Sequence, residues 1–245
     1  GDWYFEMVRY DEGERVLAEA IVELRSAGTY GVSLAVGTLA QGLYNRGKFE
    51  QAADGYRESL AEARRADHAH SIAVAMCGVG RALLALGQPD AARPHLIEAR
   101  ERFEELTIAP GVVDCTILLG VTERDLGDPQ AAAWHLLSAL TDTGIHWSDD
   151  GDFWTLQFAA SVISDRGTAA VLVGAASEAY ERSDIGQPAF ILDELRSLRD
   201  RLESELGPEE FGRHVRTGER RTRQEAIDIG RAALSAYLLE QSGAS

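Results

Sequence analysis

The sequence predicts an all-α protein: a right-handed α-solenoid of about four helical hairpins, followed by extra C-terminal capping helices. Three observations predict this fold. One pattern of small and large residues recurs every 40 residues. The apolar residues between the recurring positions follow the i, i+4 spacing of helices. The 40-residue register then ends after Gly167, where further helical segments follow.

The repeat is carried by three stretches with one spacing: NRGKFEQAADGYRESL at 45–60, ALGQPDAARPHLIEAR at 85–100 and DLGDPQAAAWHLLSAL at 125–140. Each has glycine at its third position, alanine at its eighth and a large apolar residue at its twelfth. A large apolar residue and a small one stand just upstream, in the preceding helix. This order predicts two helices that cross closely at small residues, with glycine allowing the tight turn between them. Pro89 and Pro129 fall in the first turn of the second helix, where proline loses no hydrogen bond.

Two less regular copies flank these three. A weaker one precedes them, with Gly13 at its turn and Ala18 in its second helix, and a fourth full pair begins near Asp152. Residues 1–184 are therefore expected to form the repeats, with turns near Gly13, Gly47, Gly87, Gly127 and Gly167.

The C-terminal segment, 185–245, does not continue the repeat. A helix is expected over 169–184 and another over 189–206, the latter ended by Gly207-Pro208. Thr222 and Glu225 have the spacing of a capping box, which predicts a last helix through about Leu239. Because an array of stacked hairpins needs ends that stop the stacking, these helices are expected to cap it.

The order of large apolar, small, glycine and alanine residues resembles the tetratricopeptide (TPR) repeat, lengthened from its usual 34 residues. A second set of residues resembles the C-terminal end of large actinobacterial transcription regulators of the AfsR/SARP and large LuxR (LAL, MalT-like) kind. This set is AAVLVGAA at 169–176, a Leu-rich helix, Phe211, Gly218, Thr222, Glu225 and Ala226. The resemblance implies a TPR-type regulatory region that follows a DNA-binding domain and an NTPase module. Glu219-Arg220-Arg221 departs from the shorter, more apolar stretch of those families.

The composition, 45% hydrophobic and 26% charged residues, is typical of soluble globular proteins. The net charge, 24 − 40 = −16, repels phosphate backbones and argues against direct binding of nucleic acid. No apolar run is long enough to span a bilayer, and no secretory signal is visible, so a cytoplasmic location without membrane association is expected. Cys77 and Cys115 lie in apolar helical runs, as buried reduced thiols do.

Two features point to origin rather than mechanism. Lys48 is the only lysine in an Arg-, Ala- and Gly-rich chain, which suggests a GC-rich coding bias of the actinobacterial kind. The chain opens with Gly1 rather than Met, which suggests a segment of a longer protein.

Catalytic and cofactor motifs are missing from the sequence. There is no GxxxxGK[ST] phosphate-binding loop, and Gly78-Val79-Gly80 lies in a helical stretch rather than after a strand. His68 and His70 form the one histidine cluster, which we interpret as a polar turn at a helix start rather than a metal site. No Ser/His/Asp or Cys/His arrangement stands out. We therefore predict a non-enzyme without cofactor or metal.

In TPR arrays the first helix of each pair lines a concave binding groove, and the repeat register transfers that expectation to this chain. The predicted ligand- or partner-binding residues are Gln41, Tyr44, Asn45, Arg81, Leu84, Asp114, Ile117, Val121, Arg124, Trp154, Gln157 and Phe158. The arginines could fix an anionic ligand or simply pair with Asp114, Asp125 and neighbouring acids. Trp154 and Phe158 could form a stacking platform or pack against the C-terminal helices.

A second candidate surface is a run of five arginines, Arg213, Arg216, Arg220, Arg221 and Arg223, in an otherwise acidic chain. It is either a docking patch for an acidic partner domain or an exposed helix end paired with neighbouring glutamates.

The function expected from these features is that of a non-catalytic regulatory module in a multidomain transcriptional regulator, sensing an effector or peptide in its concave groove. Its partners would be the upstream NTPase and DNA-binding domains of the parent protein, another protein or peptide, or a small-molecule effector. The alternative is a constitutive protein–protein interaction scaffold that binds a helix or peptide.

Overall fold

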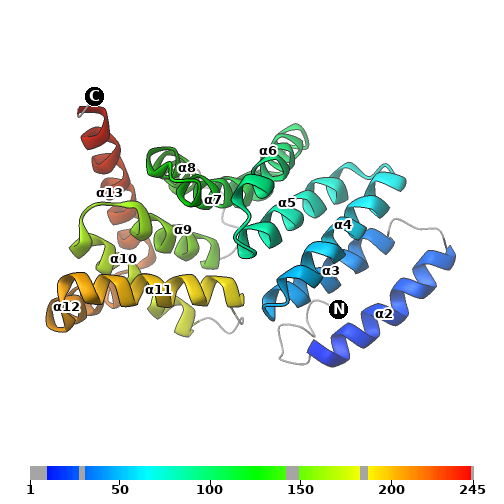
Figure 1. The fold of residues 1–245 in the computed structure, drawn as a ribbon, viewed down its shortest axis with the longest axis horizontal. Coiled ribbons are helices and arrows are strands. Elements are labelled where there is room, and N and C mark those ends of the chain that lie inside the picture. Colours follow the sequence, from blue (N-terminus) through cyan, green and yellow to red (C-terminus); the bar gives the residue numbers. More distant parts are fainter. Residues whose placement is uncertain (1–9, 28–30, 142–148, 183–186, 244–245) are drawn as a thin grey trace. The chain divides into compact units, whose positions relative to one another are not determined.

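The computed structural model of the protein describes residues 10–27, 31–141, 149–182 and 187–243. Within these ranges the chain forms helices joined by short turns and contains no strand, so the predicted all-α helical-repeat fold is confirmed (Figure 1). The helices are α2 (Tyr10–Ala27), α3 (Gly31–Asn45), α4 (Phe49–Arg65), α5 (Ala69–Ala85), α6 (Pro89–Glu105), α7 (Ala109–Asp125), α8 (Pro129–Thr141), α9 (Asp149–Val162), α10 (Arg166–Arg182), α11 (Ala189–Leu206), α12 (Pro208–Glu219) and α13 (Arg223–Gly243).

The chain divides into two compact units. The first holds the described residues up to Cys115 and the start of α11 as far as Phe190, and the second holds the rest. The division therefore falls within α7 and within α11. The predicted boundary between repeats and capping helices, at 184/185, lies outside the described residues and stays a prediction.

The recurring glycines form the turns inside the hairpins, as predicted. Gly47, Gly87 and Gly127 have φ of +74°, +67° and +85°, a conformation that costs glycine little and other residues more. In each turn the glycine N–H donates to the carbonyl three residues earlier, at 2.8–3.0 Å. Pro89 and Pro129 begin α6 and α8, which also confirms their predicted first-turn positions.

The small residues upstream of these turns allow the close crossing that the repeat predicts. A Cβ on Gly80 would lie 2.6 Å from the side chain of Leu96, and one on Gly120 would lie 2.9 Å from Leu136. Since both pairs are separated by the same 40-residue step, the repeat reproduces one contact between its two helices. The repeated residues are thus packing residues.

A second recurring turn, between hairpins, was not predicted from the sequence. Asp67 and Thr107 are 40 residues apart and have positive φ, +48° and +54°. The left-handed conformation is uncommon outside glycine and strained for a β-branched residue such as threonine.

Replacing Thr107 with glycine is expected to raise the free energy of unfolding by about 0.5–1 kcal/mol. Relief of the left-handed strain, worth roughly 1–2 kcal/mol, outweighs the added freedom of the unfolded chain. Urea denaturation checks this, with Thr141→Gly as the control at an exposed helix end. A loss of stability in Thr107→Gly would contradict the strain assigned to this turn.

Two predicted turn positions need correction. Gly13 lies inside α2, so the turn predicted there is wrong. One continuous helix forms because Leu17 and Ile21 bury an apolar stripe against α3. The turn between α9 and α10 falls at 163–165, and Gly167 lies in the first turn of α10. There the Asp165 carboxylate accepts hydrogen bonds from the N–H groups of Gly167 and Thr168, at 3.0 and 3.3 Å, and so sets the start of the helix.

Stability should depend on pH through Asp165. The Thr168 hydroxyl and the backbone N–H groups hold the pKa of this carboxyl below its usual value. A depressed folded-state pKa contributes stability that is present above the unfolded pKa, about 3.9, and is lost as pH falls through the folded value. Asp165→Ala should therefore cost about 1 kcal/mol at pH 7 and progressively less below pH 4. Urea denaturation across that range measures this, and a difference independent of pH would contradict it.

The C-terminal helices pack within the second unit. α13 contacts α8, α9 and α10, and α12 packs closely on α10. The capping box forms as predicted: the Glu225 carboxylate accepts from the N–H of Thr222 at 2.8 Å, and Thr222 Oγ1 accepts from the N–H of Glu225 at 3.3 Å. α12 was not predicted as a separate helix. Gly207, with φ of +80°, ends α11, and Pro208 starts α12 in its first turn.

Candidate partner-binding face

Residues predicted for the groove of the first unit form a hydrogen-bonded cluster across several helices. Gln41 Oε1 accepts from the Tyr56 hydroxyl at 2.8 Å and from Arg81 Nη1 at 3.0 Å. Gln41 Nε2 donates to Asn45 Oδ1 at 2.8 Å, and Arg81 forms an ion pair with Asp114. We call these five residues the unit-1 cluster. It joins α3, α4, α5 and the beginning of α7.

Charge in this cluster is balanced internally. Arg81 is only 16% exposed, and Asp114 is 33% exposed. Burial lowers the pKa of the Arg81 guanidinium, but Asp114 and neighbouring groups raise it further, so the net pKa lies well above the ordinary value. Burial also raises the pKa of Tyr56, which keeps its hydroxyl as a neutral donor. Of the two interpretations that the sequence left open, pairing with Asp114 is the one that the structure shows for Arg81.

Half of the predicted groove residues are buried. Tyr44, Leu84, Ile117, Val121, Gln157 and Phe158 are each 4% exposed or less. Their side chains fill the space between helices, which corrects the expectation that they line a surface. Burial of Phe158 likewise leaves no open stacking platform with Trp154. Gln41, Asn45, Arg81, Asp114, Arg124 and Trp154 keep part of their surface exposed.

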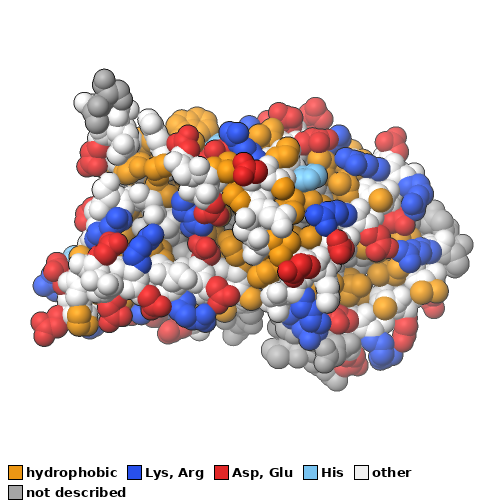
Figure 2. Space-filling view, viewed as in Figure 1, with side chains coloured by type: hydrophobic (Ala, Val, Ile, Leu, Met, Phe, Trp, Pro, Cys, Tyr) orange, Lys and Arg blue, Asp and Glu red, His pale blue; other side chains and the backbone are white. Residues whose placement is uncertain are grey.

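Two exposed apolar residues on the same helices were missed. Leu34 on α3 is 62% exposed and Val74 on α5 is 43% exposed. They are 40 residues apart, and Leu34 shares a helix face with Gln41 and Asn45, at i+7 and i+11. The repeat register itself could have found them, because the next equivalent position is Asp114. Hydrophobic surface lies between charged groups over the region of α5 (Figure 2).

We define the inner face of the first unit by these exposed residues and the accessible part of the cluster. It consists of Leu34, Gln41, Asn45, Val74, Arg81 and Asp114.

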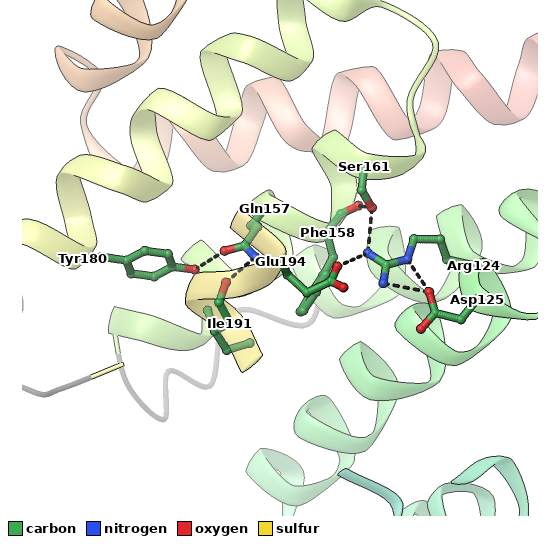
Figure 3. A network of polar contacts seen from close by, with 8 residues as sticks. All are labelled: Arg124, Asp125, Gln157, Phe158, Ser161, Tyr180, Ile191 and Glu194. Atoms are coloured by element: carbon green, nitrogen blue, oxygen red, sulfur yellow. Dashed lines mark hydrogen bonds and ion pairs between the residues drawn. The ribbon is translucent and has the colours of Figure 1, made fainter. Parts of the chain in front are cut away.

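In the second unit, Arg124 serves as an internal anchor (Figure 3). Its Nη1 donates to Glu194 Oε2 at 2.8 Å and to Ser161 Oγ at 3.3 Å, and its Nε donates to Asp125 at 2.8 Å. The guanidinium also lies 5.6 Å from the centre of the Phe158 ring. An arginine held by two carboxylates and a hydroxyl ties α7, α9 and α11 together and is not presented to an anionic ligand.

A neighbouring hydrogen-bond chain fixes the same helices (Figure 3). The buried side chain of Gln157 donates to the Ile191 carbonyl at 3.0 Å and accepts from the Tyr180 hydroxyl at 3.0 Å. Gln157 thereby joins α9 to α10 and α11. The polar groove residues of the second unit thus hold its helices together.

The five C-terminal arginines do not act as one patch. Arg223 is partly buried and pairs with Asp152 through its Nε, at 2.8 Å, and a terminal nitrogen. Arg213 and Arg221 form exposed ion pairs with Glu210 and Glu225, at 3.3 and 3.6 Å. Among the described residues, no acidic partner lies within ion-pair distance of the exposed side chains of Arg216 and Arg220. The paired-helix-end interpretation therefore fits three of the five.

His68 has the structural role that we predicted. Its Nδ1 accepts from the N–H of Ser71 at 3.3 Å and so caps the start of α5. Elsewhere in the described ranges, no group of three His, Cys, Asp or Glu side chains is placed to hold a metal ion. None of the described helices has the length and apolarity needed to cross a membrane.

Comparison with known families supports the repeat assignment. Residues 31–105 match the family described as tetratricopeptide repeat, a range that covers α3, α4, α5 and α6. A comparison with curated proteins found no match. The matched range is a TPR-repeat region, of the kind that serves as a protein–protein interaction module. It also contains all of the inner face except Asp114.

Proposed function

We propose that this chain is a non-catalytic interaction module that binds a segment of a partner protein on the inner face of the first unit. One observation carries this proposal. Leu34 and Val74 are exposed at equivalent positions of successive TPR helices, beside the amides of Gln41 and Asn45. Exposed apolar side chains next to fixed polar groups are the composition of a recognition surface rather than of a solvated helix face.

The charge balance of the cluster narrows the kind of partner. Since Asp114 and Gln41 already occupy Arg81, the inner face offers no free cation for a carboxylate or phosphate ligand. It offers two apolar contacts and amide groups that can bond a peptide backbone. This favours a peptide or helix carrying apolar side chains over an anionic effector.

The regulatory part of the proposal rests on the resemblance to AfsR/SARP-like and large LuxR regulators and on the connectivity of the cluster. Gln41, Arg81 and Asp114 link the first helices of three successive repeats. A partner that displaces one of these contacts changes how the neighbouring helices pack and shifts the population between arrangements. The partner segment would then belong to the NTPase or DNA-binding part of the parent protein.

A constitutive scaffold is the second candidate. It shares the same face but requires no change in the cluster upon binding. The reading frame upstream of Gly1 separates the two: if it encodes neither an NTPase nor a helix-turn-helix domain, the regulatory proposal fails and the scaffold stands.

Binding to the isolated upstream domains, followed by calorimetry, tests the face itself. Leu34→Ser with Val74→Ser should weaken binding about tenfold, because each removes an apolar contact from the centre of the face. Val22→Ser is the matched control, since Val22 is 67% exposed on α2 and lies outside the face. Equal affinity of the double variant and the control would refute the assignment.

A further inference from the structure

The last helix of the chain has an apolar side that faces outward. Ala226, Ile227 and Leu234 of α13 are buried, with α8, α9 and α10 as the packing partners of the helix. A second stripe runs along another side of α13. This outer stripe consists of Ile229, Ala232, Ala233, Ala236 and Leu239. A helix that ends a stack of hairpins ordinarily turns a polar side to water, yet Leu239 is 73% exposed here.

A pocket of about 400 Å³ lies along this stripe. Ile229, Ala233 and Ala236 form the α13 side, and the turn at 163–165 with Thr168 forms the opposite side. All of these residues belong to the second unit. The pocket is therefore a feature of one compact body, and its size suits large side chains of an incoming segment.

The helix pairs of this chain show what fits against small residues. A Cβ on Gly80 or Gly120 would press on Leu96 or Leu136, and a Cβ on Gly230 of α13 itself would lie 2.6 Å from Leu156. In each pair a leucine of one helix seats on a small residue of the other. The alanines of the outer stripe present the same kind of surface, so the matching occupant is a helix with leucine-sized side chains at i, i+4 spacing.

Charge decides which helix fits. Asp165 and Glu240 line the pocket, and no lysine or arginine does. The negative charges of Asp128 and Glu240 also act on the Tyr237 hydroxyl, whose pKa is raised mainly by burial and further by these two carboxylates. An acidic rim around an apolar floor attracts lysine and arginine side chains. Pairing with a second copy would bring two acidic rims together, which disfavours self-association.

We propose that the outer stripe of α13 is a second docking site, which takes an amphipathic helix of a partner protein with large apolar residues at i, i+4 spacing flanked by lysine or arginine. This site is separate from the inner face of the first unit. The chain would thus bind two segments independently.

A synthetic helical peptide tests the site: leucine at four positions of i, i+4 spacing, lysine at the flanking positions and alanine elsewhere. Binding is followed by fluorescence anisotropy and by amide chemical shifts of the full chain. Saturable 1:1 binding is expected, with shift changes at 229–240 and 163–168. The same peptide with glutamate in place of lysine should bind at least tenfold more weakly.

Variants locate the contact. Ala236→Arg fills the pocket and reverses its charge, and should weaken binding at least tenfold, whereas Val22→Arg adds the same charge on α2 and should not. Glu240→Gln should weaken binding about threefold and reduce its salt dependence. Thermal melts confirm that each variant folds, as expected at exposed positions. Equal losses in Ala236→Arg and Val22→Arg, shift changes confined to other helices, or a dimer in sedimentation that Ala236→Arg abolishes would each overturn the proposal.

Discussion

Replacing Gly218 with alanine is expected to lower the free energy of unfolding by about 3 kcal/mol or more, the largest effect expected in the second unit. A Cβ at this position would lie 1.9 Å from the carbonyl oxygen of Val171 and 2.8 Å from the amide nitrogen of Ala175. The contact is reciprocal, because a Cβ on Gly174 would lie 2.2 Å from the Val215 carbonyl oxygen. Backbone atoms cannot move aside as a flexible side chain can, so α10 and α12 must separate.

Gly212→Ala, in the same helix, is the control for this substitution. Its Cβ would meet only the flexible end of Arg216, at 3.2 Å. Alanine there should be neutral or add about 0.5–1 kcal/mol through its higher helix propensity. Urea denaturation of both variants gives the comparison. Equal stability of Gly218→Ala and Gly212→Ala would show that α10 and α12 do not cross at this glycine pair.

The second large effect concerns the unit-1 cluster. Asp114→Ala leaves the guanidinium of Arg81 charged, mostly buried and without its carboxylate. Removing one member of a buried pair costs roughly 3–5 kcal/mol, and the partial exposure of Asp114 reduces the expected loss to about 2–3 kcal/mol. Chemical denaturation monitored by circular dichroism measures this loss.

Two comparisons separate the loss of the ion pair from the loss of a side chain. Asp54→Ala breaks an exposed pair with Arg57 at 2.9 Å and should cost less than about 0.5 kcal/mol. Adding Arg81→Met to Asp114→Ala should restore most of the lost stability, because it removes the unpaired charge. No recovery in the double variant would mean that the charge is not what makes Asp114 necessary.

Most of the fold could be predicted because the repeat reports on backbone geometry. Gly47, Gly87 and Gly127 mark turns that need positive φ, and the residues flanking them have helical spacing. The end positions were harder to predict. Gly13 continues a helix because the stripe around Leu17 and Ile21 packs against α3, and a glycine does not show on its own whether such packing exists.

The candidate site was predicted only in part, because a register position gives the helix face but not the depth of burial. Arg81 and Asp114 were placed on the correct helices, and the structure shows that they neutralise each other. Leu34 and Val74 were missed because exposed apolar residues look like core residues in a sequence. Their exposure follows from the packing of α3 and α5 with their neighbours, which a single sequence does not show.

The residues that carry the resemblance to transcription regulators have structural roles. Gly174 and Gly218 allow the α10–α12 crossing, and Thr222 and Glu225 cap α13. A family signature made of packing and capping residues reports on architecture. For that reason the regulatory role must be tested on exposed residues, not on the signature.

Site-specific photo-crosslinking tests the inner face most directly. A benzophenone amino acid placed at Leu34 or Val74, in the full parent protein, should form a crosslink to the NTPase or DNA-binding part. The same group at Val22, also exposed but outside the face, should form none. Crosslinks from Val22 alone, or an equal pattern from all three positions, would contradict a partner-binding role for the inner face.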